Sequence, residues 1–196
     1  MATFNLKKGN KFEISKGIRK IQVGLGWNPA VAEGVQFDVD AHAFGLSSGR
    51  FYNDASHALT YANTSLKRDG KAFITEDKSM RNSGDDRNGK APGIDEAIDI
   101  DFDLLPEAID EISIFITIYE AKTRKQNFGM VEDSFAIVKD VSGGVDLCKY
   151  ALTSEFADAI TVQVGSMVKN DGKWSFAAVG AGTSSDELGE VLERLG

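Results

Sequence analysis

The sequence predicts an all-β protein, a sandwich of two antiparallel sheets with few short helices, one of them near the C-terminus. Three observations predict this fold: short runs alternate apolar and polar residues, turn residues separate these runs at regular intervals, and only the last segment has helical spacing. We expect one domain over 1–196, because a chain of 196 residues can bury about 70% of its unfolded surface.

The first two strands are predicted over 18–25 and 37–44. The first run is rich in apolar residues and closes on glycines. The second alternates apolar with polar residues, so that Asp38 and Asp40 leave the strand on the same face. This strand is therefore expected to have one core-facing side and one side that carries two carboxylates.

Two further strands are predicted over 97–104 and 112–119. The first alternates apolar residues with Asp99, Asp101 and Asp103, which favours a half-buried strand with the aspartates in solvent. The second is apolar on both faces, as expected of a central strand that is covered on two sides. It is the best candidate for the core of the protein.

The rest of the chain completes the sandwich and leaves one irregular segment. Later strands are predicted over 134–141, 161–168 and 174–179, followed by a helix over 184–195. By contrast, 52–93 is polar and weakly periodic, which predicts a long loop. A loop of that length in a compact domain is uncommon unless it is functional or loosely ordered.

The charge and the cysteine content limit the expected partners and the expected compartment of the protein. The 22 Lys and Arg residues against 30 Asp and Glu give a formal net charge of −8, so nucleic acid is not an expected partner. Cys148 is the only cysteine, which predicts a small core residue and a reducing compartment. No apolar run is long enough for a transmembrane segment or a secretion signal; peripheral contact with a membrane stays open.

Acidic residues gather between Gly84 and Asp103, where there are seven acids and two bases. Carboxylates this close repel one another, so they either spread into water or share a cation. Calcium suits such a stretch because it accepts carboxylates together with carbonyl oxygens from glycine-rich turns. The acids that flank glycines are the candidate ligands: Asp85, Asp86, Asp95 and Glu96. Taken alone, Asp38 and Asp40 are simply explained as surface residues.

The sequence does not match several more specific binding and catalytic motifs. No acidic run satisfies an EF-hand loop, and the stretch from Gly84 to Ala91 lacks the hydroxyl and the following helix of a phosphate-binding loop. One cysteine and two histidines argue against zinc. We expect His42 and His57 to be ordinary polar residues, and nucleophile–histidine catalysis is unsupported.

Short motifs also follow one another in a fixed order along most of the chain. They are Leu6-Lys7-Lys8-Gly9, Gly24-Leu25-Gly26-Trp27, Phe37-Asp38-Val39-Asp40-Ala41, Phe51-Tyr52-Asn53, Ser83-Gly84-Asp85-Asp86-Arg87-Asn88-Gly89, Asp95-Glu96, Asn127-Phe128-Gly129 and Lys173-Trp174-Ser175-Phe176. In these motifs and in their order, the chain resembles the TerD domain family of tellurium-resistance and general stress proteins.

The resemblance implies a calcium-binding β-sandwich that is cytoplasmic and has no known enzymatic activity. It also implies partners among other stress or tellurium-resistance proteins. The positions that correspond to the family's metal ligands are Asp38, Asp40, Asp85, Asp86, Asp95 and Glu96, with Asn28 as a further ligand after the tryptophan. The acidic loop would be the partner that Asp38 and Asp40 lack by themselves.

The chain departs from the family pattern at two of these positions and at Ile94 beside them. Asn28 and Ile94 stand where the family usually has aspartate, and Asp86 stands where it usually has asparagine. Since ligand charge tunes calcium affinity, we expect one of the usual sites to be weakened or missing.

The sequence thus predicts a non-enzymatic, calcium-binding stress-response protein associated with tellurite resistance. It would act through calcium-dependent folding or through docking to a partner. The alternative is a carboxylate-based or metal-assisted hydrolase, which needs one carboxyl with a raised pKa and a substrate cleft.

Overall fold

Two β-sheets packed face to face form the structure, as the alternating runs predict. The computed structural model describes residues 3–29, 38–84, 93–152 and 156–196. Its elements are β1 (Phe4–Leu6), β2 (Lys11–Glu13), β3 (Lys20–Pro29), β4 (Val39–Ser47), β5 (Arg50–Phe51), β6 (Ala58–Leu59), β7 (Lys67–Asp69), β8 (Ala72–Ile74), β9 (Met80–Asn82), β10 (Glu96–Asp101), β11 (Glu111–Ile118), α1 (Ala121–Arg124), β12 (Val131–Asp140), β13 (Val145–Ala151), β14 (Thr161–Asn170), β15 (Lys173–Thr183) and α2 (Leu188–Leu195).

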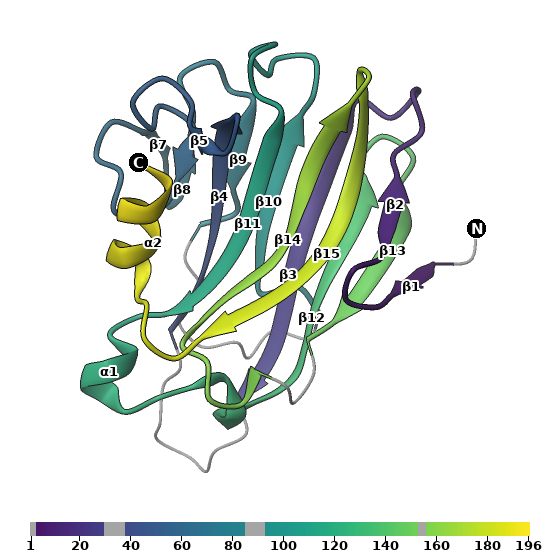
Figure 1. Ribbon diagram of the computed structural model, residues 1–196. Coiled ribbons are helices and arrows are strands. Elements are labelled where there is room, and N and C mark those ends of the chain that lie inside the picture. Colours follow the sequence, from purple (N-terminus) through teal and green to yellow (C-terminus); the bar gives the residue numbers. More distant parts are fainter. Residues whose placement is uncertain (1–2, 30–37, 85–92, 153–155) are drawn as a thin grey trace.

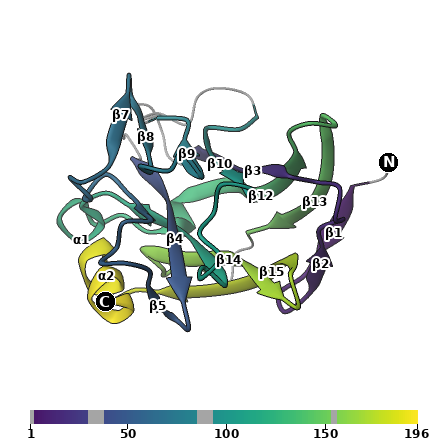
Figure 2. The same cartoon turned by 90° about the horizontal axis from the view of Figure 1, so that it is seen from above.

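The strands divide into an eight-stranded and a seven-stranded sheet. The eight-stranded sheet has the order β1-β13-β12-β3-β10-β9-β8-β7. The other sheet has the order β2-β15-β14-β11-β4-β5, with β6 paired to β4. Figure 2 shows the two layers from above, and in Figures 1 and 2 the two chain ends lie on opposite sides of the molecule. Among the described strands, only β1 and β13 pair in parallel.

The predicted central strand is β11. It pairs with β4 on one side and β14 on the other, and Ile112, Ile114 and Ile116 are at most 3% exposed. Cys148 is a buried core residue, as expected, and burial raises the pKa of its thiol to about 12. Seven consecutive residues of β11 are buried, so the side chains on both faces of this strand are covered.

The predicted C-terminal helix is present but begins at Leu188 instead of near Ser184. A capping box sets this start, since the Glu187 and Glu190 side chains each bond the other's backbone N–H. The helix packs on the seven-stranded sheet in a second apolar cluster with Phe44, Leu46, Ala58 and Phe115. Because α2 and residues near β6 cover this face, β4 is buried on both sides.

This cover changes the environment of His42, which we expected to be an ordinary polar residue. His42 is 1% exposed, and its Nε2 lies 2.9 Å from the Thr117 hydroxyl oxygen. Burial lowers the pKa of His42 to about 3, so its ring is neutral in the folded protein. Its ring stacks on Phe44 and meets Tyr61 edge to face, and no local pattern in the sequence reveals these contacts.

The segment 52–93, predicted as a long loop, contains four short strands, β6 to β9. Each has only two or three residues, too few for an alternating pattern to emerge. Side chains complete their hydrogen bonds: Asn82 Oδ1 accepts from the Phe73 N–H at 2.6 Å. The loop prediction was wrong for these strands, while 85–92 lie outside the described residues.

The remaining aspartates of the acidic stretch behave as predicted for a half-buried strand. Asp101 pairs with Lys20 at 2.7 Å, Asp103 pairs with Arg19, and Asp99 accepts from Gln22 Nε2 at 2.9 Å.

None of the helices in the described part of the chain is long and apolar enough to cross a membrane.

Candidate functional site

Two adjacent acids at the start of β10 accept backbone hydrogen bonds, one from each sheet, and the bond to Glu96 connects the two layers. Asp95 Oδ2 accepts a hydrogen bond of 2.8 Å from the backbone N–H of Trp27 on β3, in the eight-stranded sheet. Glu96 Oε2 accepts one of 2.7 Å from the backbone N–H of Ala41 on β4, in the other sheet. Asp95 is 9% exposed and Glu96 is 4% exposed.

Strand pairing explains why these two N–H groups need side-chain acceptors. The pairing of β10 with β3 ends where Glu96 meets Leu25, so Trp27 lies beyond it. On β4, β6 pairs only with Ala43 and Phe44, which leaves the same edge open at Ala41. A buried backbone donor without an acceptor destabilises a fold by about 1–3 kcal/mol, and the two carboxylates prevent this.

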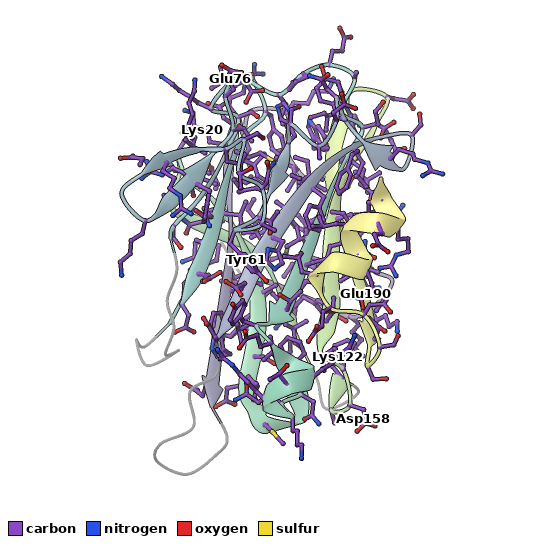
Figure 3. The ribbon with its side chains drawn as sticks, turned by 90° about the vertical axis from the view of Figure 1, so that its left-hand side faces the viewer. Lys20, Tyr61, Glu76, Lys122, Asp158 and Glu190 are labelled. Atoms are coloured by element: carbon purple, nitrogen blue, oxygen red, sulfur yellow. The ribbon has the colours of Figure 1, made fainter. Side chains whose placement is uncertain are left out.

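Asp38, Asp40 and Glu96 line one groove of about 770 Å³, which we call the β4–β10 groove. Its other lining residues are Ala41, Tyr61, Arg68, Gly70, Lys71, Phe73, Asn82, Tyr119 and Arg124. Figure 3 looks at the side of the molecule on which Tyr61 lies, with α2 to one side of it. The groove therefore brings Asp38 and Asp40 together with Glu96, one of the four candidate ligands that the sequence places in the acidic stretch.

Two tyrosines form an aromatic wall of the groove. The rings of Tyr61 and Tyr119 meet edge to face, with centroids 5.8 Å apart. Burial, followed by the negative charge of Asp40, raises the pKa of Tyr61 to about 12. The phenol therefore stays protonated, and the field of the carboxylates reaches it.

The predicted ligands divide into three groups. Asp38, Asp40 and Glu96 lie together in the β4–β10 groove, whereas Asp95 bonds Trp27 and is not among the groove's lining residues. Asn28 is exposed, and its Nδ2 donates to Asp133 Oδ2 at 3.4 Å, also away from that lining. Asp85 and Asp86 lie outside the described residues. Within the described ranges, no three His, Cys, Asp or Glu side chains form a group that could hold a metal ion.

Sequence reasoning missed the basic and aromatic residues of the groove. Arg68 and Lys71 come from the segment that showed no periodicity, and Tyr119 and Arg124 from the end of β11 and from α1. No spacing in the sequence links these positions, because only the packing of β7 to β9 against the other sheet brings them together.

A second polar cluster lies outside the groove. His57, 7% exposed, donates from Nε2 to Asp77 Oδ2 at 2.7 Å, and the Ser56 hydroxyl lies 2.8 Å from Nδ1. The ring of Tyr52 packs edge-on against His57, with centroids 5.3 Å apart. The cluster ties the segment before β6 to the turn between β8 and β9, so His57 is a buried linking residue and not an ordinary polar one.

The carboxyl of Asp77 predicts a pH dependence of stability. Burial raises its pKa, but hydrogen bonds from Ser79, His57 and Thr75 outweigh burial and hold the pKa below its ordinary value of 3.8. Such a group stabilises the fold above its unfolded pKa, and that stabilisation is lost as the pH falls through the folded pKa. We expect the free energy of unfolding to fall less steeply below about pH 4 in Asp77→Asn than in the unmodified protein.

Urea denaturation at a series of acidic pH values measures this slope. Glu76→Gln is the matched control, because the neighbouring Glu76 side chain is 90% exposed. Equal acid slopes for Asp77→Asn and for the unmodified protein would show that the carboxyl does not couple to folding.

The fold and the groove define a class: a two-sheet β-sandwich that gathers carboxylates from both layers at one edge. The TerD domain model matches residues 1–195, so the chain belongs to the TerD domain family, which comprises tellurium-resistance and stress-response proteins.

Two relatives that align with nearly the whole chain are named as stress-response and tellurium-resistance proteins. It is 30% identical to the stress response protein SCP2 of Bacillus subtilis (strain 168), covering 97% of this chain and 98% of the relative. It is 31% identical to the tellurium resistance protein TerD of Serratia marcescens, covering 98% and 96%. Neither name is that of an enzyme.

A solved structure confirms the fold. A homologue of the telluride resistance protein TerD, SCO6318 from Streptomyces coelicolor A3(2), superposes with a TM-score of 0.66 at 21% identity, covering 91% of this chain and 96% of that one. At this identity the likeness is one of fold alone.

Proposed function

We propose that this protein binds calcium in the β4–β10 groove and acts in a stress response without catalysing a reaction. In this proposal, its fold depends on the bound calcium. The observation that carries this proposal is that carboxylates from sequence-distant strands line one groove: Asp38 and Asp40 beside one sheet and Glu96 on the other. A shared cation would relieve their mutual repulsion and hold the two sheets together at this edge.

The donor chemistry of the groove fits calcium. Its acids offer hard oxygens and no sulfur or imidazole ligand, and calcium prefers about six to eight such oxygens. The described side chains alone do not complete this number. In this proposal the remaining oxygens come from Asp85 and Asp86, which the sequence predicts as ligands and which lie outside the described residues, from backbone carbonyls and from water. Asp95 and Asn28 are not among the lining residues of the groove and are not counted among these ligands.

The names of the relatives support the biological part of the proposal. Proteins named for stress response and for tellurium resistance match nearly all of this chain. We therefore propose a role in resistance to tellurite or a related stress, in the cytoplasm, with other proteins of the same response as partners.

Calcium added to chelator-treated protein is expected to give a heat of binding and to raise the melting temperature. At a calcium concentration about 100-fold above Kd, the gain is about 2.7 kcal/mol, or about 5–10 °C for a chain of this size. Titration calorimetry and thermal melts measure the two effects. Absence of both would refute the calcium site.

Two Asp→Asn variants, which keep the shape of the side chain, test whether the calcium response comes from the groove. Asp40→Asn removes one groove charge from a half-buried side chain and is expected to reduce both the heat and the shift in melting temperature. Asp99→Asn is the control, since Asp99 lies on β10 outside the groove lining and asparagine can still accept from Gln22. A carboxylate-based hydrolase would instead lose turnover in Asp40→Asn while keeping its melting behaviour.

A further inference from the structure

A second hollow lies at the end of the sandwich where β14 turns into β15, at the top of Figure 1. Its lining residues come from 14–19, 102–103 and 169–174, and we call it the Trp174 hollow. Its volume of about 390 Å³ lies within the range of about 300–1,000 Å³ that is usual for small-molecule sites. It shares no described lining residue with the β4–β10 groove, so the two are separate.

An aromatic pair forms the apolar part of the hollow. The rings of Phe102 and Trp174 stack with their centroids 5.1 Å apart and an angle of 16° between their planes. Ile14 and Ile18 line the hollow beside them. Trp174 is only half-buried, so the pair offers a flat apolar surface on which another aromatic ring can stack.

The charged lining of the hollow is basic, although the chain as a whole has a net charge of −8. Its charged residues are Lys16, Arg19, Lys169, Lys173 and Asp103. Four bases beside one acid favour an anion at this place, whereas the average field of the protein repels anions.

Carboxylates neutralise two of these four bases. Arg19 Nε donates to Asp103 Oδ2 at 2.8 Å, and the Lys173 ammonium lies 3.3 Å from a carboxylate oxygen of Glu13. Glu13 does not line the hollow, but its charge still has to be counted against the bases. Arg19 and Lys173 are therefore not the groups that would hold an added anion.

Lys16 and Lys169 are left without a counterion. Neither forms an ion pair with a residue that the structure describes; the Lys169 ammonium donates to the backbone oxygen of Glu107 at 3.3 Å and lies 6.0 Å from the centroid of the Trp174 ring. Asp171, in the turn of the hairpin, is exposed and does not line the hollow. One hollow thus combines two uncompensated positive charges with an aromatic surface.

We propose that the Trp174 hollow binds a nucleoside monophosphate, with the base on Phe102 and Trp174 and the phosphate between Lys16 and Lys169. A phosphomonoester carries close to two negative charges at pH 7, which matches the two unpaired ammonium groups. Lysine binds phosphate as a point charge, and every nucleobase can stack on an aromatic side chain. A polynucleotide is not the expected ligand, because the net charge of −8 repels its many phosphates.

The test titrates adenosine 5′-monophosphate into the protein by calorimetry, once with chelator and once with calcium. Equal binding is expected in both, because the hollow and the β4–β10 groove have no described lining residue in common. Adenosine and inorganic phosphate should each bind at least about tenfold more weakly than the nucleotide, since each supplies only one of the two contacts.

Two exposed lysines provide a matched pair of variants. Lys16→Gln removes one unpaired charge from the hollow, and Lys11→Gln removes an equal charge from β2, five positions earlier, where the side chain does not line the hollow. Lys16→Gln should weaken the binding of adenosine 5′-monophosphate by about tenfold, the loss expected for one charge-assisted hydrogen bond, and leave that of adenosine unchanged. Lys11→Gln should leave both unchanged.

Tryptophan fluorescence reports on the base. The chain has two tryptophans, and Trp27 is only 5% exposed, whereas Trp174 is half-buried. Stacking of adenine on Trp174 is expected to quench the emission. Trp174→Phe keeps a ring for stacking, so it should abolish the quenching while calorimetry still detects binding. Quenching that persists in Trp174→Phe would contradict this placement of the base.

The remaining outcomes decide the proposal. It is overturned if adenosine 5′-monophosphate gives no heat of binding, or if Lys16→Gln and Lys11→Gln weaken the binding equally. Inorganic phosphate that binds as tightly as the nucleotide would also overturn it, because the aromatic pair would then play no part. So would tighter binding of a 5′-phosphorylated single-stranded oligonucleotide. None of these results depends on calcium, so the calcium proposal and this inference stand or fall separately.

Discussion

Replacement of Gly26 by alanine is expected to lower the free energy of unfolding by about 3 kcal/mol, the upper end of the range for overpacking. A Cβ at this position would overlap the backbone carbonyl oxygen of Gly93 and would lie 2.6 Å from the Phe135 ring. The Gly93 carbonyl lies two residues before Asp95 in the chain that leads into β10, so we expect its displacement to disturb Asp95 and Glu96 as well. The variant should therefore also lose its response to calcium.

Gly24→Ala is the matched control for this prediction. Gly24 lies on the same face of β3, but an added Cβ would meet side-chain atoms instead of backbone: Ile94 Cδ1 at 2.5 Å, Ile94 Cγ1 at 2.9 Å and Ile137 Cγ2 at 3.1 Å. These can turn aside, so we expect a loss of about 1 kcal/mol. Chemical denaturation measures both variants, and equal losses would show that the Gly93 carbonyl does not limit the position.

The second large effect is expected at Glu96, where two roles can be separated. Glu96→Ala leaves the backbone N–H of Ala41 without its acceptor, a change that costs about 3 kcal/mol for a buried hydrogen bond to a charged group. Glu96→Gln keeps an oxygen that can accept from Ala41, so in chelator it should lose only about 1 kcal/mol. Its missing charge should, however, reduce the calcium-induced rise in melting temperature.

Denaturation in chelator and thermal melts with calcium distinguish these roles. Equal losses for Glu96→Ala and Glu96→Gln in chelator would contradict the sheet-linking hydrogen bond. A full calcium response in Glu96→Gln would exclude its carboxylate from the proposed site. Either outcome is informative because alanine removes the acceptor and the charge together, while glutamine removes only the charge.

The link between the two sheets also gives the acidic motif a structural meaning. Asp95 and Glu96 each satisfy a strand edge, one in each layer. A metal held at this edge would act on the same contacts that join the layers, so stability and metal binding are expected to be coupled. This coupling would be the physical basis of the calcium-dependent fold that we propose.

The sequence by itself determined the all-β class, the central strand over Ile112 to Ile118 and the common face of the Asp-x-Asp pair, because alternation is a local property of each strand. It also named Glu96 as one of four candidate ligands in the acidic stretch. It did not reveal the short strands β6 to β9, since two or three residues carry no period, nor the start of α2 at its capping box.

Only the tertiary structure decided which groups meet. The bond from Ala41 to Glu96 spans 55 positions of the chain, and Arg68 and Tyr61 reach the same groove through β7 to β9 and the segment before them. Burial of His42 likewise depends on distant contacts, among them Thr117 on β11, 75 positions further along the chain. Such contacts arise from the packing of two sheets. The periodicity of one strand does not predict which residues of the facing sheet will contact it.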